Sequence, residues 1–210
     1  LWVDYIDPGF TLYRHLRNKI SEYRADYGRQ PEMIFLKNHG VFLSAGNAQR
    51  IRDICEVMFD KLKARYDEAS VELELPVGAL PDERSVTKMK EQIISAYPEE
   101  PVNVAVSGAF EPAEGPLTPD HIVYAGSYPL KGEPTEQAIN EHREEFATLP
   151  RVIKFDGAVF AVGKSRKKAE LALELAQDAA LVRQLTKAFG GVEYMDERAR
   201  RFIENWEVEL

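Results

Sequence analysis

IFLKNHGVFLSAGN, residues 34–47, is the stretch that decides how this chain begins to fold. Two short apolar runs flank Asn38-His39-Gly40, a triplet suited to a tight turn because Asn tolerates left-handed backbone angles and Gly has no side chain to clash. The pattern predicts a strand, a turn or bulge, and a second strand. Asn47 is a good N-cap for the helix that follows, in which apolar residues recur at helical spacing as far as about Tyr66.

The same order of elements recurs near the end of the chain. Residues 151–163 read RVIKFDGAVFAVG, again a strand, a Gly turn and a strand, and Ser165 can cap a long helix with Leu171, Leu175, Val182 and Leu185 on one face. Aligning Gly40 with Gly157, an offset of 117 positions, pairs His39 with Asp156 without a gap. We infer an internal duplication, with chance similarity between two common hairpin and helix units as the alternative.

The remaining segments are read from apolar spacing and turn residues. Asp7-Pro8-Gly9 predicts a turn before an amphipathic helix that ends ahead of Tyr27-Gly28. Periodicity weakens from Asp67 to Pro101, although a short helix at 86–94 fits the pattern. Further on we expect a strand at 102–106, a loop at 111–116, a short strand at 122–124 and a helix at 134–146. These signals predict a first module at 1–70, a linker region at 71–101 and a second module at 102–210.

Composition excludes several classes of function. The 210 residues carry 27 Lys and Arg against 35 Asp and Glu, a net charge of −8, which argues against nucleic acid or an anionic membrane surface as a partner. No apolar run reaches the length of a membrane span. Cys55 is the single cysteine, so no internal disulfide forms, and we expect a cytoplasmic protein. The apolar residues directly after Leu1 suggest a piece of a longer protein.

His39 is the strongest candidate for chemistry. The other histidines, His15, His121 and His142, lie on or beside ordinary amphipathic elements. A histidine at a turn between two buried strands has the rigidity that a metal ligand needs, and a purely structural turn histidine is the alternative. One imidazole does not make a site, and the sequence contains no HxH, HExxH, GxGxxG, P-loop or nucleophile-elbow pattern.

Two groups of segments resemble a known family. PGF with its helix, and IFLKNHGVFLSAGN with its long helix, resemble the C-terminal third of the class II aldolase/adducin family over about residues 1–66. LTPDHIVYAG resembles the segment of the same family that precedes the metal site. The end, from PRVIKFDGAVFAVG to FIENWEVEL, is similar to the tail of the aldolase portion in long bifunctional aldolase/dehydrogenase proteins. The resemblance implies an α/β chain: a class II aldolase-like three-layer fold, partial in the first module, followed by a degenerate second aldolase-like α/β module.

The resemblance also implies a function. The NHG histidine of that family is the last of three zinc-binding histidines, and His39 matches it. This implies metal-dependent aldol cleavage of a small-molecule sugar phosphate, with zinc or another divalent metal as a Lewis acid and the other ligands, an HxH pair among them, upstream of Leu1. Asp156 would leave the second module without zinc. Family members are commonly oligomers, so a homo-oligomer is expected.

Two alternatives to the aldolase remain. One is a sugar-phosphate 4-epimerase on the same fold, and the other is a non-catalytic, adducin-like scaffold. No general acid or base can be assigned.

Overall fold

The chain is an α/β protein, as predicted, in a computed structural model that describes residues 1–98 and 102–206. It divides into a first unit, Leu1–Val71, and a second unit that begins at Glu72. Each unit has its own sheet with parallel and antiparallel neighbours. The two units are described separately below.

The first unit is built on the predicted hairpin. Its elements are β1 (Trp2–Val3), α1 (Phe10–Tyr27), β2 (Met33–Leu36), β3 (Gly40–Leu43) and α2 (Ala48–Glu68). The sheet order is β1-β2-β3, with β1 parallel and β3 antiparallel to β2. Leu12 of α1 packs with Val3, Ile34 and Leu36 to form the core. The Asn47 side chain accepts a hydrogen bond of 2.9 Å from the Arg50 amide, which confirms the predicted cap of α2.

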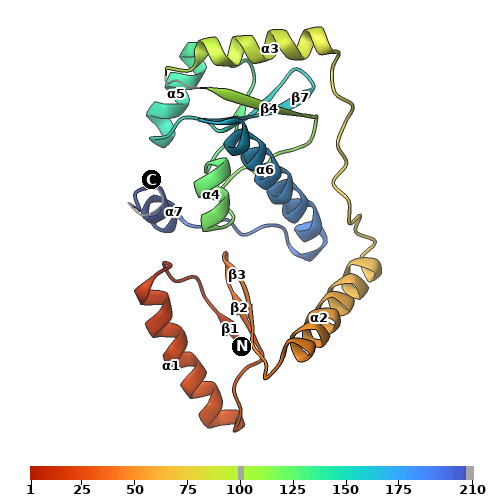
Figure 1. Cartoon of the computed structure of the whole chain (residues 1–210), viewed down its shortest axis with the longest axis vertical. Coiled ribbons are helices and arrows are strands. Elements are labelled where there is room, and N and C mark those ends of the chain that lie inside the picture. The colour runs from red at the N-terminus through yellow and green to blue at the C-terminus, as the bar shows by residue number, and fades with distance from the viewer. Residues whose placement is uncertain (99–101, 207–210) are drawn as a thin grey trace. The chain divides into compact units, whose positions relative to one another are not determined.

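The second unit has a helix on each face of a four-stranded sheet. Its elements are α3 (Glu83–Ala96), β4 (Asn103–Gly108), α4 (Pro119–Ala125), β5 (Leu130–Lys131), α5 (Glu136–Phe146), β6 (Val152–Phe155), β7 (Ala158–Gly163), α6 (Arg166–Thr186), η1 (Lys187–Phe189) and α7 (Glu197–Glu204). The sheet order is β4-β7-β6-β5. Figure 1 shows α3 and α6 on opposite sides of β4. Successive side chains of a strand alternate between these two faces.

The two helices fill separate parts of the core. Met89 and Ile93 of α3 pack with Ile153 and Phe160 of the sheet. On the other face, α6 meets Val152 and Val159, but through alanines instead of the leucine face that we expected. The buried positions of α6 are Ala169, Ala172, Ala176, Ala179 and Ala180. Small side chains let the helix lie close to the sheet, and the larger Leu171, Leu175, Val182 and Leu185 are only half-buried.

Two other expectations about this unit need revision. The predicted strand at 122–124 is part of α4, because Thr118 caps the His121 amide and Pro119 takes the first helical turn. A short apolar run does not distinguish a strand from a buried helix. In addition, α3 lies within the segment expected as a linker, and Met89 and Ile93 of α3 belong to the core of the second unit.

Both units contain the order strand, helix, strand, hairpin strand, long helix. The equivalent long helices, α2 and α6, each have 21 residues, and their caps Asn47 and Ser165 lie 118 positions apart. The same offset pairs Val41-Phe42 with Val159-Phe160. This common order supports the inferred duplication.

The ungapped offset of 117 is wrong at the turn, however. Leu36 lies opposite Gly40, which leaves a three-residue loop, whereas Phe155 lies opposite Ala158, which leaves a two-residue loop. The left-handed residues Asn38 (φ 52°) and Asp156 (φ 46°) therefore correspond, and Gly157 occupies the position of His39.

The role of α3 can be tested with two adjacent isoleucines. Ile93 is fully buried, whereas Ile94 is 42% exposed. We expect Ile93→Ala to lower the free energy of unfolding by about 2–5 kcal/mol because it leaves a cavity against the sheet. Ile94→Ala, the matched control, should cost less than about 1 kcal/mol. Urea denaturation measures both, and equal losses would show that α3 is not part of the core.

Candidate functional site

His39 is the last residue of the three-residue turn between β2 and β3. Its amide donates a hydrogen bond of 3.2 Å to the Leu36 carbonyl oxygen, which fixes the backbone at the turn. The side chain is half-buried. Within residues 1–98 and 102–206, no group forms a hydrogen bond or ion pair with its imidazole ring. The ring is therefore held at the tip of a hairpin with both nitrogens available.

The structure does not bring a second metal ligand to His39. In the described part of the chain, no three or more His, Cys, Asp or Glu side chains gather in a group that would hold a metal ion. By itself, His39 could supply one ligand to a metal ion. A complete zinc site with three protein ligands is not formed by these residues.

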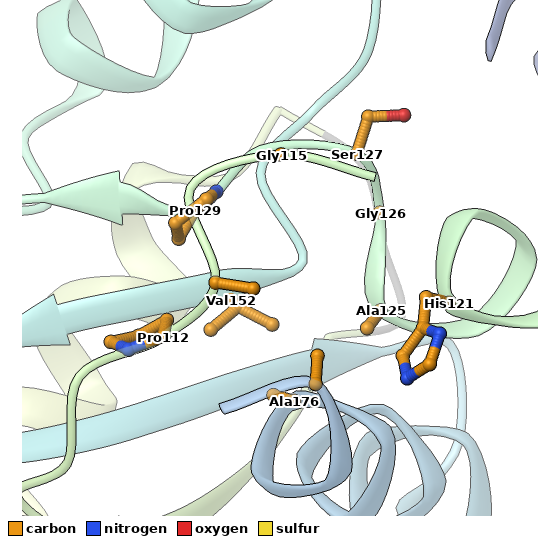
Figure 2. Close-up of a pocket in the computed structure, with 11 residues that line it drawn as sticks. Pro112, Gly115, His121, Ala125, Gly126, Ser127, Pro129, Val152 and Ala176 are labelled. Carbon is orange, nitrogen blue, oxygen red and sulfur yellow. The ribbon is translucent and has the colours of Figure 1, made fainter. Parts of the chain in front are cut away.

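His121 lies in the second unit and is 8% exposed. Its Nδ1 is 2.7 Å from Thr118 Oγ1, and its Nε2 is 3.1 Å from Asp178 Oδ2. Hydroxyl, imidazole and carboxylate in this order resemble a proton relay. The adjoining pocket, shown in Figure 2, has about 30 Å³, which is room for one water molecule. Thr118 also caps α4, so the contacts of His121 serve to fasten α4 to α6.

The remaining two histidines are placed as ordinary residues. Both ring nitrogens of His142 face backbone carbonyl oxygens, at 3.0 Å from Thr148 and 3.1 Å from Tyr128. His142 thereby anchors α5 to neighbouring loops. His15 is a half-buried residue of α1.

A larger pocket, of about 310 Å³, lies in the second unit and was not anticipated from the sequence. Lys154, Arg183 and Lys187 line it together with Glu111. Lys154 forms an ion pair with Glu111, and this hydrogen bond lowers the pKa of the Glu111 carboxyl group below its usual value. In the sequence, the spacing of four positions between Arg183 and Lys187 indicates that both lie on one side of a helix. Nothing in the sequence places Lys154 beside them.

Comparison with protein-family models, with curated proteins and with solved structures finds no significant match for this chain. Among the described residues, none of the helices has both the length and the hydropathy that crossing a membrane requires.

The structural role of His121 is open to a direct test. His121→Ala removes a buried ring together with its contacts to Thr118 and Asp178, so we expect the free energy of unfolding to fall by about 1–3 kcal/mol. His39→Ala is the matched control, and because its ring has no partner among the residues that the structure describes, the change should stay within about 0.5 kcal/mol. Thermal or urea unfolding measures both. If His121→Ala unfolds with the same free energy as the wild type, His121 does not hold α4 against α6.

Proposed function

We propose that this chain is part of a class II aldolase-type lyase that cleaves a sugar phosphate with zinc or another divalent metal, and that His39 is one metal ligand. The observation that carries the proposal is the half-buried imidazole of His39, held by a hairpin and without a partner in the described residues. A metal ligand needs a free ring nitrogen and a fixed backbone. Among the described residues the His39 ring has no partner, and the hydrogen bond from the His39 amide to the Leu36 carbonyl oxygen fixes the turn. Burial of both strands does not contribute, because Val41 and Phe42 of β3 are exposed instead of buried as expected.

The chain itself supplies only part of such a site. As the family resemblance implies, we place the other ligands, including the HxH pair, in polypeptide upstream of Leu1. The described residues form no group of three or more potential ligands. A bound cation supplies positive charge where negative charge develops on a substrate oxygen as the carbon–carbon bond breaks. His39 would bind through one nitrogen as the neutral imidazole, with its other nitrogen directed at an acceptor.

The fold and setting are parts of the same proposal. The class II aldolase-like three-layer fold would be partial in the first unit and repeated, in degenerate form, in the second. The common element order of the two units supports this arrangement, as does the helix on each face of the second sheet. Asp156-Gly157 provides no imidazole there, so the second unit would hold no metal at its turn. A homo-oligomer and a cytoplasmic location complete the proposal.

The test compares His39→Ala with His15→Ala in the intact protein that contains this chain. His39→Ala should lower the bound zinc from about one ion per subunit to nearly none and reduce cleavage of a ketose 1-phosphate by at least about 100-fold, because one of three ligands is lost. His15→Ala, in the same unit, should retain both. Elemental analysis and a coupled aldehyde assay give the two readouts.

Three outcomes would count against the proposal. Full zinc occupancy in His39→Ala would remove His39 as a ligand. Interconversion of epimers without release of two fragments would identify the epimerase instead. An intact protein that neither binds zinc nor turns over sugar phosphates would favour the non-catalytic scaffold.

A further inference from the structure

We infer that the second unit binds a small organic phosphate in the pocket of about 310 Å³ lined by Lys154, Arg183 and Lys187. This site is separate from His39, which belongs to the first unit. The inference therefore does not depend on the proposed lyase activity. It follows from the walls of the pocket, its charge and its apolar surface.

The walls of the pocket are fixed by hydrogen bonds. The Gln184 side chain of α6 donates to the backbone carbonyl oxygens of Glu72 and Glu74, at 2.8 and 2.9 Å. The Gly78 amide donates to the Ala109 carbonyl oxygen at 2.8 Å. Leu75 and Pro76, which form one wall, are therefore held at both ends. A preformed pocket of this kind loses little entropy when a ligand enters.

The charge of the pocket favours a dianion. The Lys154 charge is balanced by its ion pair with Glu111. Within the described part of the chain, no carboxylate forms an ion pair with Arg183 or Lys187. Two positive charges remain, and a phosphate monoester near neutral pH carries close to two negative charges. The positive charges of Arg183 and Lys187 converge on one pocket in a chain whose net charge is −8.

Arg183 and Lys187 lie at the C-terminal end of α6, so their charges must be compared with the partial charge of the helix end. The C-terminal end of a helix carries about half a negative charge, which opposes an anion. Arg183 and Lys187 together exceed this partial charge about fourfold. Arginine also presents a planar fork of donors that matches phosphate oxygens.

The apolar wall indicates an organic ligand instead of free inorganic phosphate. Leu75, Pro76 and Phe110 line the pocket beside the cations, and Phe110 is part of the buried core. A carbon skeleton attached to the phosphate would cover the exposed surface of Leu75 and Pro76 and remove it from water. Glycerol 3-phosphate is a suitable probe, with inorganic phosphate and glycerol as its separated parts.

The test is isothermal titration of the full chain with these three probes. We expect glycerol 3-phosphate to bind at least threefold more tightly than inorganic phosphate, and glycerol not to bind. Arg183→Gln should weaken glycerol 3-phosphate binding at least tenfold, because it removes a charged hydrogen-bond donor. Glu111→Gln should strengthen binding severalfold, because it removes the negative charge that lines the pocket.

The matched control is Arg166→Gln, at the opposite end of α6 and 88% exposed at its side chain. This variant loses the same charge but should keep the affinity of the wild type within about twofold, since it lies far from the pocket along the helix. Circular dichroism checks that each variant is folded. Equal weakening by Arg166→Gln and Arg183→Gln, weaker binding by Glu111→Gln, or no binding at millimolar glycerol 3-phosphate would each overturn the inference.

Discussion

The second unit depends on the burial of β7 between two helices. Val159 and Phe160 are adjacent in the sequence, and their side chains point to opposite faces of the sheet. Both are completely excluded from solvent. Phe160 meets α3 and Val159 meets α6, so this one strand joins three layers. The pocket and the contacts of His121 rest on this arrangement, because α6 carries Asp178, Arg183 and Gln184.

The alanines of α6 explain how a long helix can lie so close to the sheet. A Cβ atom added at Gly163 would come within 2.5 Å of the Ala169 amide nitrogen, so the strand leads into the helix with no room for a side chain. Ala176 and Ala180 continue the close contact along the helix. The cations of the pocket lie near the far end of the same helix. Close packing therefore determines where these cations stand relative to the sheet.

Local chemistry made much of this fold predictable. Asn47 and Ser165 cap their helices as expected, and both hairpins lie where apolar runs meet at a turn. The failures arose where tertiary contacts decide. Residues 122–124 are helical because Thr118 and Pro119 start a helix ahead of them, and the buried face of α6 is made of alanines, which apolar spacing alone does not single out. For the site, the sequence pointed to His39 as a candidate, but it did not place Lys154 of β6 beside Arg183 of α6, because only the packing of α6 on the sheet brings these two residues into one pocket.

The two hairpins differ in loop length, and this difference limits which side chains the second turn can carry in the manner of the first. Both residues of its short loop have positive φ, a geometry that glycine adopts most readily and that Asn, Asp and His tolerate better than other side chains. Exchanging Asp156 for histidine would occupy the counterpart of Asn38, one step away from where the ring projects in the first hairpin. A single substitution therefore does not convert the second turn into the first, because the two loops differ in length by one residue.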